Sequence, residues 1–139
     1  MLDKLYGRVL VPPAVVNELL RGREGGIDLP HLERLPWISV ESPEGLDKVP
    51  TAAELGAGEK EVLALAIQRP GSLVVLDDRL ARSHAEALRL PVTGILGILL
   101  RAKSEGLLPR IAPVLDKLDR LGFRLSSKTR IAVLKLASE

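Results

Sequence analysis

The most informative pattern of apolar and polar positions lies in the middle of the chain. After Glu59, residues 62–67 are apolar on nearly every side of a helix, which is typical of a buried helix. Residues 73–76 are apolar without alternation, so they predict a strand buried on both faces. This strand runs directly into Asp77 and Asp78, and the carboxyl ends of parallel strands are where such sheets bind ligands.

The rest of the pattern predicts strands and helices in alternation. Short apolar runs predict strands, and amphipathic segments bounded by Gly, Pro, Ser or Thr predict helices. The expected strands cover residues 8–11, 37–40, 73–76 and 90–93. The expected helices cover a tail at residues 2–6, then 14–21, a short helix beginning at 51–54, and 59–67, 79–89, 94–105, 109–121 and 126–137. This order predicts an α/β fold with a parallel sheet covered by helices on both faces.

Composition limits the class of protein. The chain has 139 residues, enough for one domain (1–139), and it has no Cys and two His, which disfavours disulfide and zinc sites. No apolar run is long enough to span a membrane and no signal peptide is visible, so we expect a cytoplasmic protein. Arg outnumbers Lys by 13 to 7, and this ratio weakly favours a thermophilic source.

The small net charge of +2 hides an uneven distribution of charge. Residues 1–78 carry 8 basic and 13 acidic side chains, whereas residues 79–139 carry 12 basic and 5 acidic ones. An acidic half beside a basic half suits a metal site that handles a polyanion, although a solvated basic helical surface explains the pattern equally well. The only aromatic residues are Tyr6, Trp37 and Phe123, which argues against recognition of bases by stacking.

Four carboxylates are candidates for a metal site. The set consists of Glu18, Glu59, Asp77 and Asp78. Three of these carboxylates can be explained without a metal ion. Glu18 can be the polar edge of a helix, Glu59 a partner of the helix dipole, and Asp78 an N-cap. Asp77 is harder to explain, because one helix needs one cap. Carboxylates of this kind suit Mg²⁺ or Mn²⁺, ions that activate water for phosphodiester hydrolysis.

Other sites fit the sequence less well. There is no P-loop lysine, and residues 56–59 follow no strand and lack the third glycine of a dinucleotide-binding turn. His84 has no matched Ser or Cys nucleophile for a hydrolase triad. A receiver-like phosphoacceptor domain is also disfavoured, because its paired acids would be expected at the first strand.

The sequence resembles the PIN-domain superfamily, and within it the DUF3368 branch. The matching blocks cover most of residues 5–107, with residues 108–139 as a helical extension. They are residues 9–15 with Glu18-Leu19, Gly58-Glu59 with residues 62–66, residues 76–79 with Ala81-Arg82, and residues 92–94, 97–99, 102–103 and 106. The resemblance implies a three-layer α/β/α sandwich with a short parallel sheet and an acidic site for Mg²⁺ or Mn²⁺. Many members are single-strand ribonucleases, and several are toxins with an antitoxin partner.

By motif position, the resemblance gives roles to residues of this chain. Glu18, Glu59 and Asp77 take the places of catalytic acidic residues, with Asp78 as a further metal ligand. On the same hypothesis, four basic residues would meet RNA phosphates: Arg79, Arg82, Arg101 and Lys103.

The chain departs from the family pattern at its beginning. The family starts with a strand that ends in Asp followed by Thr or Ser, and the given sequence begins after that unit. Three explanations stay open: a start farther upstream, a sheet that closes without the strand, or a second chain that fills the gap. A catalytically inactive regulatory or protein-binding module acting as a homodimer is therefore the alternative function.

Overall fold

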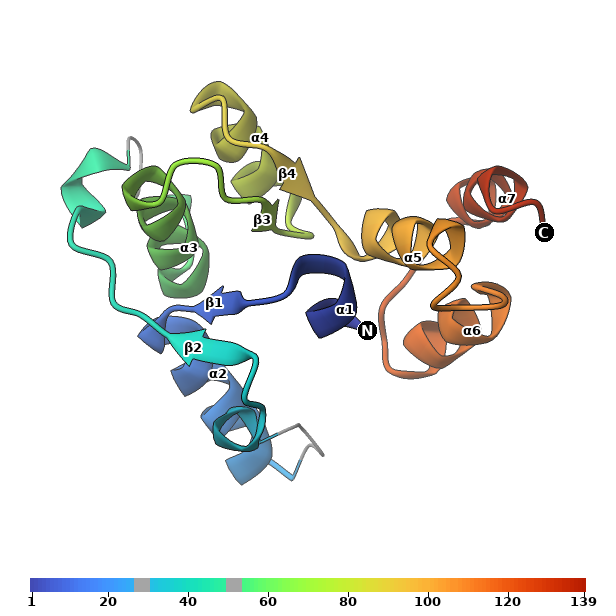
Figure 1. The fold of residues 1–139 in the computed structure, drawn as a ribbon, viewed down its shortest axis with the longest axis horizontal. Coiled ribbons are helices and arrows are strands. Elements are labelled where there is room, and N and C mark those ends of the chain that lie inside the picture. Colours follow the sequence, from blue (N-terminus) through green and yellow to red (C-terminus); the bar gives the residue numbers. More distant parts are fainter. Residues whose placement is uncertain (27–30, 50–53) are drawn as a thin grey trace. The chain divides into compact units, whose positions relative to one another are not determined.

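The computed structural model describes residues 1–26, 31–49 and 54–139 (Figure 1). It falls into two compact units, one over residues 2–93 and one formed mainly by residues 94–139, and each is described by itself. In the first unit, the helices are α1 (Leu2–Tyr6), α2 (Pro13–Glu24), η1 (Leu32–Arg34), η2 (Leu46–Lys48), α3 (Ala57–Gln68) and α4 (Arg79–Ala87). Its strands are β1 (Val9–Val11), β2 (Ile38–Val40), β3 (Val74–Val75) and β4 (Val92–Thr93). Within the described residues of both units, no helix is long and apolar enough to cross a lipid bilayer.

The predicted α/β fold with parallel strands is confirmed, but the strands form two separate pairs. β1 pairs in parallel with β2 from Val9 opposite Ile38, and β3 pairs in parallel with β4 from Val74 opposite Val92. Within the described residues, no backbone pairing joins β1 to β3. The parallel sheet expected from the sequence is thus divided between its two halves.

The buried central helix is also confirmed. In α3, Leu63, Ala64 and Ala66 are buried, and they pack in one core cluster with residues of β3 and α4. The other buried members of this cluster are Val49, Val74, Leu76, Ala81 and Ala85. Because both faces of this helix are covered, its polar residues are confined to its ends.

Helix α2 is longer than predicted. Gly22 was expected to end it, but the helix continues to Glu24, and the Gly25 N–H donates to the Arg21 carbonyl at 3.0 Å. A glycine inside a helix costs only about 1 kcal/mol, so Gly22 need not stop it. The helix predicted to begin at residues 51–54 lies almost wholly outside the described residues.

The second unit consists of three helices. They are α5 (Ile95–Ser104), α6 (Ala112–Arg120) and α7 (Ser127–Leu136). Each begins and ends within three residues of its predicted bounds. Leu99 of α5, Leu115 of α6 and Val133 of α7 belong to one buried cluster. The three helices predicted from the sequence therefore pack on one another.

The side chain of Glu139 ties the end of α7 to the beginning of α6. Its Oε2 accepts from the Ile111 N–H at 2.8 Å, and its Oε1 accepts from the Ala112 N–H at 3.2 Å. Lys103 on α5 donates to the same carboxylate at 3.0 Å and also to the Ala137 carbonyl. The Ile111 N–H, followed by Lys103 and the Ala112 N–H, lowers the pKa of Glu139 to about 2.

This contact predicts acid sensitivity of the three-helix unit. Because the folded-state pKa of Glu139 lies below its usual value of 4.5, the carboxylate stabilises the fold above that pH. The stabilisation should disappear as the pH falls from about 4.5 towards 2. Glu139→Gln should therefore lower the melting temperature at pH 7 and lose this difference from wild type near pH 2, as followed by circular dichroism. Glu105→Gln is the control, because Glu105 forms only an exposed ion pair with Arg101, and it should change the melting temperature little. An effect of Glu139→Gln that does not depend on pH would contradict the stabilising role of the Glu139 carboxylate.

Candidate functional site

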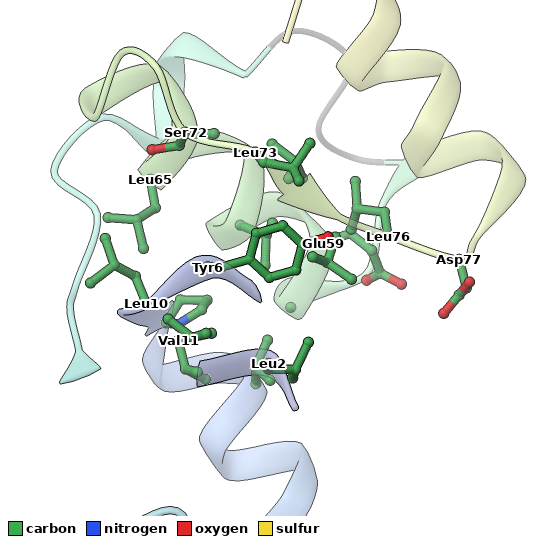
Figure 2. Close-up of a pocket in the computed structure, with 18 of the residues that line it drawn as sticks. Leu2, Tyr6, Leu10, Val11, Glu59, Leu65, Ser72, Leu73, Leu76 and Asp77 are labelled. Carbon is green, nitrogen blue, oxygen red and sulfur yellow. The ribbon is translucent and has the colours of Figure 1, made fainter. Parts of the chain in front are cut away.

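A cavity of about 690 Å³ opens in the first unit between the two strand pairs (Figure 2). Its walls come from α1, β1, α2, α3 and β3. Leu10 and Val11 of β1, Leu65 of α3, and Leu73 and Leu76 around β3 give it an apolar lining. We call this space the strand-edge cavity.

Both strands that line the cavity present an open backbone edge. The peptide groups of Val9 and Val11 point towards β2 and its flanking residues. The Val9 N–H donates to the Trp37 carbonyl at 2.9 Å, and the Val11 carbonyl accepts from the Glu41 N–H at 3.1 Å. Because peptide groups alternate along a strand, those of Leu10 point to the other edge.

The same alternation holds on the opposite wall. The N–H groups of Val74 and Leu76 donate to carbonyls in and beside β4 at 2.8 and 2.9 Å, so the peptide groups of Val75 point away from β4. Within the described residues, no hydrogen bond to the peptide groups of Leu10 or Val75 is present on these open edges. The cavity therefore separates two strand edges that are free to accept another strand.

All four predicted carboxylates line the strand-edge cavity, and two of them lie against glycines at the start of α3. Glu18 comes from α2, and its Oε1 lies where a Cβ on Gly58 would approach to 2.6 Å. The Glu59 carboxylate folds back over Gly56 in the same way. The two glycines thus leave room for two carboxylates, neither of which has a hydrogen bond or ion pair among the described residues.

The position of Glu18 depends on Glu61, a residue outside the four predicted carboxylates. The Glu61 carboxylate on α3 accepts from the Ala14 N–H at the first turn of α2 at 3.0 Å. This bond holds the beginning of α2 against α3, about one turn from Glu18. Its partner lies 47 residues away in sequence, so no local pattern identifies it.

The two aspartates follow β3 at the cavity. Asp78 caps α4, because its Oδ2 accepts from the Ala81 N–H at 2.9 Å, so the predicted N-cap is confirmed. Asp77 precedes the cap and is exposed, with its side chain drawn in Figure 2. The cap uses one oxygen of Asp78 and leaves the other for a second partner.

The carboxylates share the cavity but do not form a closed coordination sphere. Among residues 1–26, 31–49 and 54–139, no three His, Cys, Asp or Glu side chains are close enough together to hold a metal ion. The donor set, made only of carboxylate oxygens, still fits the chemistry of Mg²⁺ and Mn²⁺. Metal binding would need these side chains to move towards one another.

The predicted phosphate-binding residues differ in their surroundings. Arg79 is exposed and Arg82 half-buried in the first turn of α4, directly after the two aspartates. In the second unit, the Arg101 Nε lies 2.9 Å from Glu105, and Lys103 is bound by Glu139. The last two would have to leave these partners to meet a phosphate.

The contact at Gly58 gives a testable consequence. Gly58→Ala would place a Cβ against the flexible end of Glu18, so the carboxylate should move while the backbone stays in place. Because Ala favours a helix over Gly by about 1 kcal/mol, thermal stability should be equal or slightly higher. Mn²⁺ binding measured by calorimetry should nevertheless weaken. A control with Ala at Gly97, an exposed position in α5, should leave Mn²⁺ binding unchanged; equal binding by the Gly58 variant would show that Glu18 contributes nothing.

Comparison with known protein families places this chain in a family. A family model described as DUF3368, a PIN domain, matches residues 1–139. No curated protein and no solved structure matches the chain.

Proposed function

Because the chain belongs to the PIN-domain family, we propose that it is a ribonuclease that depends on Mg²⁺ or Mn²⁺ and cleaves within single-stranded RNA. Its role would be that of a toxin, restrained by an antitoxin protein. The observation that supports this best is that all four predicted carboxylates line one cavity.

Each acidic residue has a proposed part in the site. Asp77 and Glu59 would bind the ion directly or through water, and Glu18 would orient water or hold a second ion. Asp78 would contribute the oxygen that its cap leaves over. The bound ion supplies an activated water and stabilises the leaving oxygen of the phosphodiester.

The remaining lining and the neighbouring basic residues would position the substrate. Apolar side chains such as Leu10 and Leu76 make the cavity walls less polar, which would strengthen charge interactions beside them. Arg79 and Arg82 would bind phosphates beside the aspartates. Arg101 and Lys103 would bind phosphates only after breaking their ion pairs with Glu105 and Glu139.

Calorimetry with Mn²⁺ tests the acidic site. The wild-type chain should bind Mn²⁺, and Asp77→Asn or Glu59→Gln should weaken binding at least about tenfold, which corresponds to about 1.4 kcal/mol. The reason is that each variant removes a negative oxygen ligand. The same variants should lose Mn²⁺-dependent cleavage of a labelled single-stranded RNA.

Asp47→Asn is the matched control, since Asp47 is exposed on η2 and does not line the cavity. It should bind Mn²⁺ as the wild type does. Unchanged binding and cleavage in both cavity variants would refute the proposed site.

A second function is supported by the open strand edges. The unpaired peptide groups of Leu10 and Val75 can accept an extended strand from another chain, as in β-strand addition. On this view, the protein is an inactive regulatory or protein-binding module, and a second copy supplies the strand in a homodimer.

Light scattering after size exclusion tests this second function. A charged residue on a strand edge opposes pairing, so Val75→Lys should convert a dimer to a monomer. Val40→Lys on β2 is the control, because Val40 is more exposed than Val75 (57% against 44%) and lies outside the cavity lining. If the wild type is monomeric, or if both variants stay dimeric, the strand edges do not mediate self-association.

A further inference from the structure

The connection between α6 and α7 carries four basic side chains without acidic partners. They are Lys117 and Arg120 in the last turn of α6, Arg124 in the connecting segment, and Lys128 in the first turn of α7. All four are exposed, and none has an ion pair within the described residues. We call this set the basic turn.

Other cations of the three-helix unit are already engaged. Residues 94–139 carry 9 basic and 4 acidic side chains, a balance of +5. The engaged pairs are Arg101–Glu105, Lys103–Glu139, Arg110–Glu139 and Arg130–Asp116. The excess positive charge is therefore carried mainly by the basic turn, with Lys135 and the acidic Asp119 as the remaining charged residues.

Backbone hydrogen bonds fix the conformation of the basic turn. Gly122 has a φ of +93°, and the Phe123 N–H returns to the Leu118 carbonyl at 2.9 Å, which reverses the chain after α6. Ser126 then caps α7 by accepting from the Thr129 N–H at 3.1 Å. The four basic side chains are thus carried on a defined scaffold rather than on a free tail.

Helix stability explains only half of the set. Lys117 and Arg120 lie at the negative end of the α6 dipole, where cations are favoured. Lys128 lies at the positive end of α7, where a cation is disfavoured, and no acidic residue shares that first turn. Arg124 belongs to neither helix. Helix stability therefore does not explain Arg124 and Lys128, and both add to the positive charge of the basic turn.

We propose that the basic turn binds the phosphate backbone of single-stranded RNA. This inference rests on the proposed ribonuclease function and adds to it a substrate-holding surface. None of the four residues belongs to the predicted set Arg79, Arg82, Arg101 and Lys103. Because the contacts are to phosphates, the binding should be insensitive to base sequence and strongly dependent on salt.

Fluorescence anisotropy with a labelled U20 RNA tests the proposal. The full chain is titrated in EDTA, so that no metal-dependent cleavage takes place, at several salt concentrations. Each phosphate contact contributes about 0.7 to the slope of log affinity against log salt, so Arg120→Ala combined with Arg124→Ala should lower that slope by about 1.4. A labelled oligonucleotide of equal length with mixed sequence should bind with the same affinity.

The matched control removes the same charge elsewhere. Arg21→Ala combined with Lys48→Ala takes two exposed cations from α2 and η2, and it should leave the salt slope unchanged. Equal slopes for the two double variants would overturn the proposal, as would displacement of U20 by poly-glutamate at equal charge concentration. Binding of U20 through the turn without any Mn²⁺-dependent cleavage would uphold this surface and refute only the ribonuclease function.

Discussion

The burial of α3 is the constraint on which the first unit depends. Its middle, from Leu63 to Ala66, is buried, and β3 and α4 cover part of it. Acidic residues can then occur only in its first turns, where Glu59 reaches the strand-edge cavity and Glu61 anchors α2. One buried helix therefore both forms the core and places carboxylates from two helices at the same opening.

Local signals in the sequence predicted most of this fold. Periodicity located the helices, and caps such as Asp78 and Ser126 act as their residue types suggest. One error was at the end of α2, where a single Gly was read as a stop. Another was at residues 73–76, expected to be buried on both faces: Val74 and Leu76 are buried, but Leu73 and Val75 are 39% and 44% exposed. Contacts between distant segments were not predictable, because neither the Glu61 bond to Ala14 nor the Glu139 bonds to Ile111 follow from any local spacing.

The candidate site was predictable in its residues but not in its geometry. Asp77 directly follows the end of β3, and the carboxyl ends of parallel strands are where such sheets bind ligands. Glu59 reaches the same cavity for another reason, because the buried middle of α3 confines its acidic residues to its first turns. Whether the carboxylates converge depends on the distance between the two strand pairs. No backbone pairing across the open edges of Leu10 and Val75 fixes that distance within the described residues, and the pattern of side chains does not predict it.

The same open edges connect the two proposed functions. A strand that paired with both edges would satisfy the peptide groups of Leu10 and Val75, cover apolar surface, and fix β1 relative to β3. Glu18 follows β1 and Asp77 follows β3, so fixing the strands would also fix the distance between these carboxylates. Strand addition and metal binding should then reinforce each other, because each is easier once the other has brought the two halves of the divided sheet into register.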